Sequence, residues 1–360
     1  MQRRKSRKII VGVLEIGDGS PISVESMTAT DTKNIEATIE QVEELRLAGC
    51  DIVRIAIYDE ECTDTIRILK SLTNIPLVAD IHFDYRLAIA SIDNGIDMVR
   101  INPGNIGTPD SVKRLLAVAK ERQIPIRIGV NSGSLPEEMI KRYGNTSKAM
   151  VESVLKHVSI LEDYGYDNIL LSLKSSDVIK TVKACREISQ LTDYPLHLGV
   201  TEAGTVFSGS LKSSIGIGTL LLDGIGDTIR VSLTAPPVEE VRVGHEILKC
   251  LGLRKEGVEI ISCPTCGRCR IDIISLANTL KEGLKDIKYP LKIAIMGCAV
   301  NGPGEAKEAD IGIAGGLGKA VLFKKGKVSE TLPFDDIVKT ITAEVRRMAA
   351  YGCSDNSTGI

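Results

Sequence analysis

Residues 97–102 read Asp-Met-Val-Arg-Ile-Asn, a short apolar run bounded by two polar residues. A run of this length and composition is typical of a buried strand. Its unusual member is Arg100, because a charged side chain is costly to bury within an apolar strand. Two other stretches repeat the pattern, Ile-Val-Arg-Ile at 52–55 and Thr-Ile-Arg-Val at 228–231. The sequence therefore predicts a set of similar strands that carry arginines.

Strand-like runs recur throughout the first two thirds of the chain. After a hairpin expected at 9–16, eight such runs lie at 22–27, 51–57, 76–81, 97–102, 125–131, 168–174, 195–201 and 227–233. Amphipathic stretches such as 35–47 and 111–122 lie between them and have the apolar spacing of helices. Eight strand and helix units over roughly 230 residues fit a (β/α)8 barrel, whereas an open α/β sheet seldom needs so many regular repeats. We expect a TIM barrel over residues 1–254.

The ends of the predicted strands are where a barrel enzyme keeps its reactive groups. Five cations lie within these strands or at their ends: Arg54, Arg100, Arg127, Lys174 and Arg230. Salt bridges inside the barrel are an equally good explanation for any one of them, and three carboxylates are available: Glu25, Asp80 and Glu202. Five cations outnumber three carboxylates. We therefore expect the barrel mouth to bind a polyanion, such as a phosphate or diphosphate ester.

Other polar residues complete the predicted mouth, where they are candidates for binding hydroxyl groups or moving protons. They follow the strands in this order: Asp80, His82, Asn102, Asn131, Thr201 and Glu202. Glu202, after the seventh strand, is the candidate for proton delivery. The remaining histidines are given structural roles, because His157 and His245 lie in helical patterns and His197 lies within a strand.

Composition excludes several classes of protein. The chain has 360 residues, a formal net charge of −2 and 3% aromatic residues without tryptophan, so no nucleic-acid footprint is predicted. The apolar run at 9–14 is too short for a signal peptide or a membrane span. Nine cysteines without an export signal indicate a reducing cytoplasm, where clustered thiols serve metal or redox chemistry more often than disulfides.

The last third of the chain is expected to be a smaller α+β domain over residues 255–360. A helix from Pro236-Pro237 to about Leu251 completes the barrel, and the boundary is placed near Arg254. Strands and helices then stop alternating: strands are expected at 258–262, 291–296 and 309–314, a hairpin at 321–332, and helices at 271–284 and 335–350.

Four cysteines of this domain indicate a metal site. Cys263, Cys266 and Cys269 lie in Cys-Pro-Thr-Cys-Gly-Arg-Cys, and Cys298 follows a later apolar strand. Their spacing suits a four-cysteine zinc site and an iron–sulfur cluster equally well. If the metal is zinc, the chain is a zinc-stabilised, non-redox phosphate-ester enzyme or binding protein.

Longer motifs resemble those of the bacterial 4-hydroxy-3-methylbut-2-enyl diphosphate synthases. In the second domain they are Cys-Pro-Thr-Cys-Gly-Arg at 263–268, Met-Gly-Cys-Ala-Val-Asn-Gly-Pro-Gly-Glu-Ala at 296–306 and Ala-Asp-Ile-Gly-Ile-Ala-Gly-Gly at 309–316. In the barrel they are Ala-Asp-Ile-His-Phe at 79–83, Val-Arg-Ile-Asn-Pro-Gly-Asn at 99–105, Leu-Gly-Val-Thr-Glu-Ala-Gly at 198–204 and Ile-Arg-Val-Ser-Leu-Thr at 229–234. The resemblance covers nearly the whole chain.

This resemblance implies an enzyme of the non-mevalonate isoprenoid pathway. Its reaction is the reductive ring opening and dehydration of 2-C-methyl-D-erythritol 2,4-cyclodiphosphate, with two electrons delivered singly by flavodoxin or ferredoxin. The barrel residues named above, together with Ser232, are then expected to bind the diphosphate substrate. The second domain is expected to be reductase-like and to hold a [4Fe-4S] cluster.

The family's cluster ligands map onto Cys263, Cys266, Cys298 and the carboxylate of Glu305. Glu305 is then also a catalytic candidate, since a carboxylate is a weaker ligand for iron than a thiolate. One departure from the family pattern is Cys269, at a position where cysteine is unusual. The resemblance also implies a homodimer in which the cluster domain of one subunit caps the barrel of the other.

Overall fold

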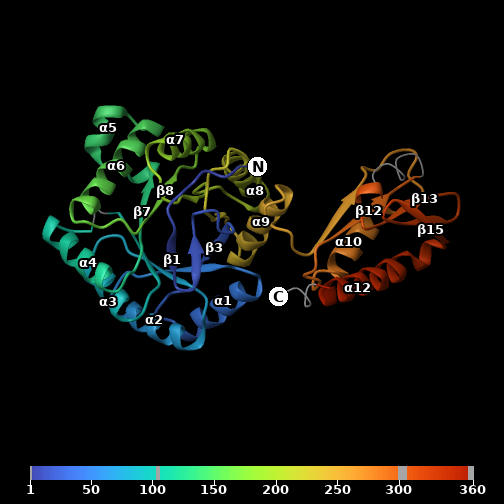
Figure 1. Ribbon diagram of the computed structural model, residues 1–360, viewed down its shortest axis with the longest axis horizontal. Helices are drawn as coiled ribbons and strands as arrows, with labels where there is room; N and C mark the ends of the chain where they lie inside the picture. Colours follow the sequence, from blue (N-terminus) through green and yellow to red (C-terminus); the bar gives the residue numbers. More distant parts are fainter. Residues whose placement is uncertain (1, 103–105, 299–305, 356–360) are drawn as a thin grey trace. The chain divides into compact units, whose positions relative to one another are not determined.

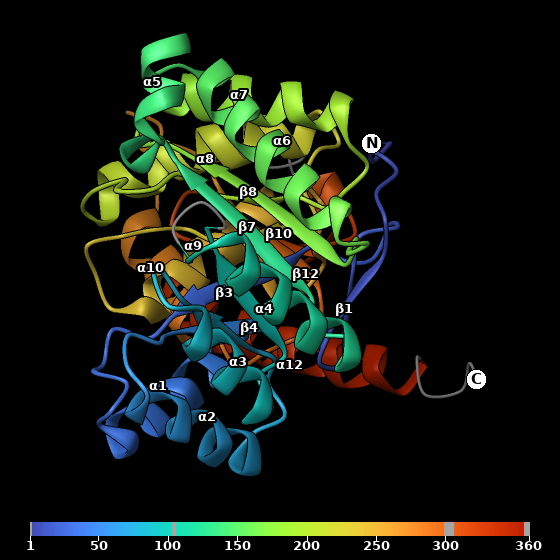
Figure 2. The same ribbon diagram turned by 90° about the vertical axis from the view of Figure 1, so that its left-hand side faces the viewer.

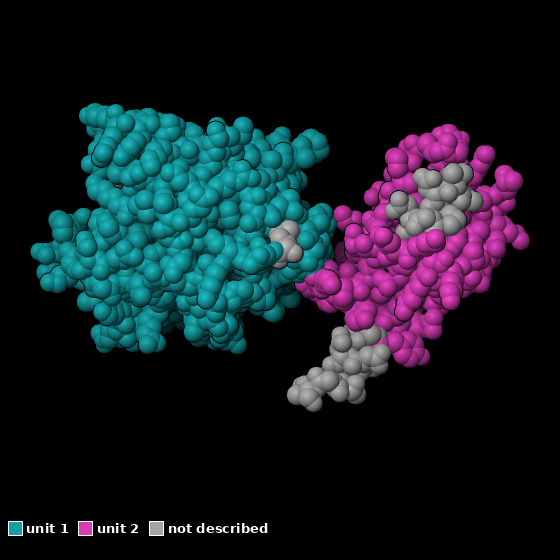
Figure 3. All heavy atoms as spheres, turned by 45° about the horizontal axis from the view of Figure 1, so that its top comes forward, with its two compact units in different colours: residues 1–254 teal, residues 255–360 magenta. Residues whose placement is uncertain are grey.

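The structure is a computed structural model that describes residues 2–102, 106–298 and 306–355. The chain forms two compact units, Met1–Arg254 and Lys255–Ile360, which Figure 3 colours separately. Each unit has its own buried apolar core. Among the described residues, none of the helices combines the length and the apolar content needed to cross a bilayer.

Eight parallel strands of the described residues form the sheet of the first unit. Their order is β8-β7-β6-β5-β4-β3-β10-β9, and a parallel bridge between Leu171 and Leu196 links its two edges into a nearly closed barrel. Helices surround the strands in Figures 1 and 2. The strand bounds are β3 Ser23–Met27, β4 Ile52–Ala56, β5 Leu77–Asp80, β6 Met98–Ile101, β7 Ile126–Asn131, β8 Ile169–Lys174, β9 His197–Leu198 and β10 Thr228–Ile229.

The helices of this unit begin with recognisable caps. Thr108 accepts a hydrogen bond from the backbone N–H of Ser111 and precedes Pro109, a good first helical residue because proline has no N–H to satisfy. The helix bounds are α1 Ile35–Leu47, α2 Glu61–Leu72, α3 Tyr85–Asp93, α4 Pro109–Glu121, α5 Glu137–Tyr143, α6 Ser147–Asp163, α7 Val178–Leu191, α8 Val206–Leu222 and α9 Pro237–Cys250.

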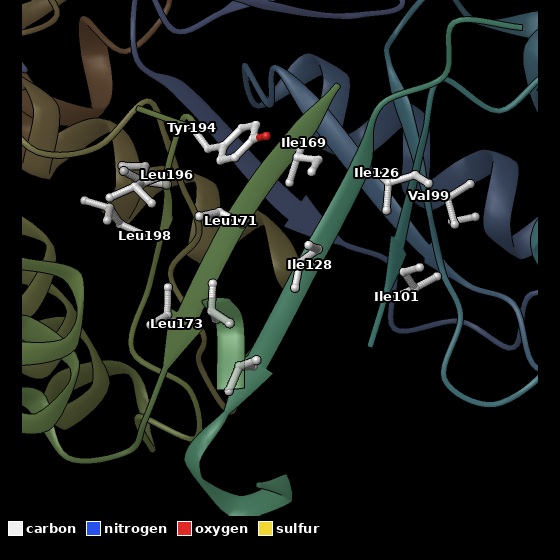
Figure 4. Packing of buried hydrophobic residues seen from close by; sticks show 14 of the residues in the cluster. Val99, Ile101, Ile126, Ile128, Ile169, Leu171, Leu173, Tyr194, Leu196 and Leu198 are labelled. Carbon is white, nitrogen blue, oxygen red and sulfur yellow. The ribbon is translucent and has the colours of Figure 1, made fainter. Parts of the chain in front are cut away.

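Alternation along the strands separates an apolar outer layer from the barrel interior. Figure 4 shows this outer layer, where Ile126 and Ile128 of β7 lie beside Ile169, Leu171 and Leu173 of β8 in the core packed against the helices. Because successive side chains of a strand point to opposite faces, the residues between them face inward. Arg127 and Lys174 are therefore interior residues. The barrel fold, read from this pattern, is confirmed.

The interior of the barrel is apolar at the end where the strands begin. The hairpin of β1, Ile9–Val11, and β2, Leu14–Ile16, contributes Val11 and Ile16 to a buried group that also contains Ile52, Val78, Met98 and Leu170. These last four residues lie at the beginnings of barrel strands. The charged residues come later in the same strands, so they lie toward the C-terminal mouth.

The second unit has a mixed five-stranded sheet in the order β11-β12-β13-β14-β15, where the first three strands are parallel and the rest antiparallel. Its helices α10 and α12 share one buried core with this sheet. The bounds are β11 Val258–Ser262, α10 Ile273–Gly283, β12 Leu291–Met296, β13 Ile311–Gly315, β14 Ala320–Lys324, β15 Lys327–Leu332 and α12 Ile337–Asp355.

Several element bounds differ from the sequence predictions. The runs at 195–201 and 227–233 form regular strand only over two residues each, because they pair where the barrel closes and share few ladder positions with their neighbours. The sequence also gave no indication of α5, a short helix between β7 and α6. Helix α12 begins at Ile337 after a 3₁₀ turn and extends beyond residue 350.

Candidate active site

The deepest charged pair of the barrel joins two strands that are not neighbours in the sheet. Glu25 of β3 accepts two hydrogen bonds from Arg127 of β7, at 2.9 and 2.6 Å, and both side chains are fully buried. Burial alone raises the pKa of Glu25, but the guanidinium groups of Arg127 and Arg54 outweigh it and hold that pKa below its ordinary value. Both oxygens of the Glu25 carboxylate thus accept a hydrogen bond from Arg127.

A second carboxylate, Asp80 at the end of β5, collects three partners. Arg100 donates a hydrogen bond to it at 3.0 Å, Arg54 lies 3.8 Å away and His82 lies 3.6 Å away. Burial would raise the pKa of Asp80, but Arg54, the nearby His82 and Arg100 together lower it. His82 itself is about half exposed, so it is the member of this group that faces solvent.

Arg100 fits against β7 because position 129 is a glycine. A β-carbon added to Gly129 would lie 2.5 Å from the Nε atom of Arg100. The absent side chain thus leaves the room in which the guanidinium reaches Asp80.

The partner of Arg230 is Glu240, a residue that the sequence analysis did not single out. Glu240 of α9 lies 3.6 Å from Arg230, accepts the hydroxyl hydrogen bond of Ser26 at 2.9 Å and accepts the backbone N–H of Leu233 at 3.0 Å. It is buried on the apolar face of α9 with Val241 and Gly244. A carboxylate on a buried helical face is the signal that could have identified it.

Glu202 does not pair with any cation of the described residues. It is exposed, and its backbone has a φ of 53°, a left-handed conformation that is uncommon outside glycine. The sequence analysis considered Glu202 as a salt-bridge partner for the cations of the barrel. Glu240 takes that role for Arg230 instead. Glu202 stays a candidate for proton delivery on the strength of its position after β9.

The remaining candidates lie at the carboxyl ends of the strands. Asn102 follows β6 and is buried, Asn131 ends β7 and is half-buried, and Ser232 lies two residues after Arg230. Lys174 ends β8 and is buried, with its amino group 2.9 Å from Nε2 of His197. His197 and its second partner, Thr228, were not assigned to the site from the sequence.

The described mouth holds more positive than negative charge. Even with Lys174 left uncounted, Arg54, Arg100, Arg127 and Arg230 outnumber Glu25, Asp80 and Glu240, the last of which replaces Glu202 in the set expected from sequence. Burial and the nearby Arg54 lower the pKa of Arg230 to about 10, despite Glu240. The site is therefore electrostatically incomplete without a negatively charged ligand.

In the second unit, three of the four predicted cluster ligands lie near one edge of the sheet. Cys263 follows β11 and Cys298 follows β12, and these strands are parallel neighbours with Ser262 opposite Ile295. The backbone N–H of Gly297 donates to the Sγ of Cys263 at 3.2 Å, which holds this sulfur beside the end of β12. Cys266 is exposed in the connecting loop. Glu305, the fourth predicted ligand, lies outside the described residues.

Cys269 has a packing environment of its own. Its thiol donates to the carbonyl of Ile271 at 3.1 Å, and a β-carbon on Gly297 would lie only 2.5 Å from its sulfur. All four cysteines of the zinc alternative are described, yet no three His, Cys, Asp or Glu side chains of the described residues gather closely enough to hold a single metal ion. Cys263, Cys266 and Cys298 are thiol donors of the kind that zinc and iron–sulfur clusters both take.

Solved structures resemble the barrel in fold. A type I 3-dehydroquinate dehydratase from Clostridium difficile matches 69% of this chain and 98% of its own, with a TM-score of 0.52 and 15% identity. A dihydropteroate synthase from Xanthomonas albilineans matches the same share of this chain and 98% of its own, with a TM-score of 0.52 and 14% identity. At this identity the likeness concerns the fold alone.

Sequence comparison extends over both units. The model of the GcpE TIM-barrel domain matches residues 6–245, and the model of the GcpE protein C-terminal domain matches residues 259–347. A protein of Caldanaerobacter subterraneus subsp. tengcongensis is 56% identical, and one of Thermodesulfovibrio yellowstonii is 54% identical; each match covers 96% of this chain and at least 98% of the relative. Both relatives are named 4-hydroxy-3-methylbut-2-en-1-yl diphosphate synthase (flavodoxin). With both of its units matched and the predicted barrel in place, the chain belongs to the GcpE family.

Proposed function

We propose that this chain is a 4-hydroxy-3-methylbut-2-enyl diphosphate synthase that acts on 2-C-methyl-D-erythritol 2,4-cyclodiphosphate. The reaction takes up two electrons and two protons, opens the ring by cutting a C–O bond at carbon, and releases water. Residues 1–254 bind the substrate and residues 255–360 hold the cluster. We assign the activity to a reducing cytoplasm, and the nine cysteines of the chain support this assignment.

The observation that carries this proposal is the surplus of cations at the barrel mouth. A diphosphate group balances a surplus of positive charge, and arginine recognises its oxygens through paired N–H donors. Arg54, Arg100, Lys174 and Arg230 are the groups we assign to this contact. Arg127 lies beneath these groups. Its hydrogen bonds to Glu25 hold in place the charged side chains against which the diphosphate binds.

The uncharged side chains at the mouth orient the rest of the substrate. Asn102, Asn131 and Ser232 offer hydrogen bonds to its hydroxyl and ring oxygens. Glu202 is exposed at the mouth and is our candidate to deliver the proton that the departing oxygen needs. His82, which lies between Asp80 and solvent, is our candidate for a further contact to the diphosphate.

A [4Fe-4S] cluster bound by Cys263, Cys266, Cys298 and Glu305 would supply the electrons singly, as such clusters do. The N–H of Gly297 would donate a hydrogen bond to the sulfur of Cys263 in that role. The relatives' names specify flavodoxin, which we take as the electron donor, with ferredoxin as the alternative. The substrate and this donor are the only partners we propose besides a second copy of the chain.

One experiment tests the function and separates it from the zinc alternative. Protein purified without oxygen is analysed for iron, acid-labile sulfide and zinc, and is then supplied with the cyclic diphosphate and reduced flavodoxin. We expect about four irons and four sulfides per chain and conversion to the linear allylic diphosphate. One zinc per chain, no sulfide and no turnover would instead establish a zinc-stabilised, non-redox protein.

A further inference from the structure

A buried chain of hydrogen bonds runs beneath the barrel mouth across three neighbouring strands. The amino group of Lys174 on β8 lies 2.9 Å from Nε2 of His197 on β9, and Nδ1 of His197 lies 2.6 Å from the hydroxyl of Thr228 on β10. All three residues are buried. Both ring nitrogens of His197 therefore have partners, so the orientation of the ring is fixed from both sides.

The fold leaves room for the Lys174 side chain at one position. A β-carbon on Gly199 would lie 3.0 Å from both Cε and Nζ of Lys174 and 2.6 Å from the carbonyl oxygen of Arg230. Gly199 is the next residue after His197 that faces the barrel interior, and its missing side chain leaves this space empty. Lys174 reaches His197 because that space is empty.

The charges around this pair are mostly positive. Arg54 of β4, Arg127 of β7 and Arg230 after β10 act on both residues, and Glu25 of β3 opposes them, with its carboxylate 3.8 Å from Nε2 of His197. On the side of the helices the neighbour is Cys185 of α7. Burial raises the pKa of its thiol to about 12, so the thiol stays neutral. Burial, then Arg54 and Arg230, lower the pKa of Lys174 well below its ordinary value, and burial, then Lys174, lower that of His197.

Two groups in hydrogen-bond contact under these conditions titrate as a unit. In the ligand-free mouth, a proton on either one adds a cation to a site that already has more cations than carboxylates. A dianionic phosphate group reverses this balance, because negative charge nearby favours the protonated form of the pair.

We propose that His197 is a positioning residue for Lys174 and that the Lys174–His197 pair takes up a proton when a diphosphate group binds the barrel mouth. This inference rests on the proposed function, since it assumes an anionic ligand at this site. It adds a property that a simple set of permanently charged cations lacks: ligand affinity that depends on protons. Because the bound form holds the extra proton, affinity falls as pH rises above the range in which the pair can be protonated.

Titration calorimetry of the full-length holoenzyme with inorganic pyrophosphate tests this coupling. Each titration is run at one pH in two buffers that differ in ionisation enthalpy, and the difference in heat gives the number of protons exchanged. Pyrophosphate contributes its own proton exchange equally to every variant, so differences between proteins report the pair. The series is repeated from neutral to alkaline pH.

The variants are Lys174→Met, His197→Gln and Thr228→Val, with His157→Gln as the matched control. His157 is also a buried histidine, but it lies on α6 and its Nδ1 has no hydrogen-bond partner among the described residues. We expect wild type and His157→Gln to take up the same fraction of a proton, approaching one at the pH of greatest coupling. Lys174→Met should lose this uptake.

His197→Gln keeps a polar group of similar size but cannot share the proton. We expect it to bind pyrophosphate about tenfold more weakly, the loss typical of one hydrogen bond to a charged group, and to shift the pH at which uptake occurs. Thr228→Val should shift it in the same way, because it frees the ring of His197, and it keeps the test informative if His197→Gln folds poorly.

Two results overturn the inference while leaving the anion site intact: equal proton uptake in wild type and Lys174→Met, or His197→Gln behaving like His157→Gln in affinity and pH dependence. Absence of pyrophosphate binding in wild type is a different failure. It would remove the anion site on which the proposed function depends, and the inference with it.

Discussion

Arg100 and Arg230 differ from Arg127 in how completely their charges are satisfied. Arg127 donates to both oxygens of Glu25, whereas Arg100 makes one hydrogen bond to Asp80 and Arg230 approaches Glu240 only to 3.6 Å. The Nε atoms of Arg127 and Arg230 are both buried without a hydrogen-bond acceptor among the described residues. Arg127 uses its other two nitrogens on Glu25, whereas Arg230 makes no side-chain hydrogen bond within the described part of the chain. These two arginines therefore retain donors for a ligand.

We predict that Arg100→Ala and Arg230→Ala each raise the KM for the cyclic diphosphate and lower turnover. A lost contact to a charged group costs about 1.5 to 3 kcal/mol, or roughly tenfold to 150-fold in kcat/KM. Steady-state kinetics measure this, with Arg122→Ala as the control because Arg122 is exposed at the end of α4. Wild-type kinetics in both mouth variants would show that the diphosphate binds elsewhere.

The four cysteines of the second unit should divide into three ligands and one packing residue. We predict that Cys263→Ser, Cys266→Ser and Cys298→Ser lose the cluster, measured as iron, sulfide and the brown absorbance of the purified protein. Cys269→Ser should keep the cluster, because its thiol donates to Ile271 and fills the space beside Gly297.

Glu305→Ala completes this series, since the family pattern makes Glu305 the fourth ligand. It should keep the fold, hold iron poorly and lose turnover. Loss of the cluster in Cys269→Ser together with full activity in Glu305→Ala would transfer the fourth position to Cys269.

At the scale of the strands, Gly129 of β7 determines where Arg100 of β6 lies. We predict that Gly129→Ala raises KM several-fold, because its β-carbon would lie 2.5 Å from Nε of Arg100 and displace the guanidinium from Asp80. The measurement is KM and kcat beside those of Gly133→Ala. Gly133 follows the same strand, is exposed and has no atom within 4 Å of an added β-carbon. If both variants behave alike, the position of Arg100 does not depend on Gly129.

The pair of β3 and β7 links distant parts of the barrel and should dominate its response to acid. We predict that Glu25→Gln lowers the free energy of unfolding by about 3 to 5 kcal/mol at pH 7, because it leaves Arg127 buried without its partner. The folded-state pKa of Glu25 is depressed, so its contribution is present above its unfolded value of about 4.3 and is lost as pH falls through the folded pKa.

Chemical denaturation at pH 7 and in acid measures this dependence. The difference between wild type and Glu25→Gln should shrink as pH falls below about 4. The control is Glu43→Gln, which removes a carboxylate from an exposed pair with Arg46 on α1 and should leave unfolding unchanged. A difference that stays constant down to strongly acid pH would mean that the charge on Glu25 does not stabilise the fold.

The strands and most helices were predictable because local alternation and apolar spacing are properties of neighbouring residues. The pairing of the charges was not. Arg230 meets Glu240 because α9 packs on β3, a contact between elements more than 200 residues apart in sequence. The buried face of α9 is a local signal for Glu240, but no local pattern pairs it with Arg230. His197 is a similar case, since its role depends on Lys174 and Thr228 of the adjacent strands. The cysteine motif predicted a metal site but left the ligand at 305 to family resemblance.

At the scale of the whole molecule, helix α8 presents an apolar stripe to solvent. Phe207, Leu211 and Ile215 are spaced by four residues and therefore lie on one side of the helix, where they are 77%, 50% and 60% exposed. Exposed apolar surface of this kind commonly marks an association site.

We predict a homodimer whose two active sites each combine the barrel of one chain with the cluster domain of the other. Electrons can reach a substrate in the barrel mouth only when a cluster domain covers that mouth, and a two-fold arrangement lets two chains satisfy this requirement for each other.

Mixing a Cys298→Ser chain, which lacks the cluster, with an Arg100→Ala chain, which lacks a binding cation, should then restore part of the activity. The reason is that one of the two sites in a mixed dimer receives both intact parts. Verified mixed dimers without rescue would show instead that each chain completes its own site.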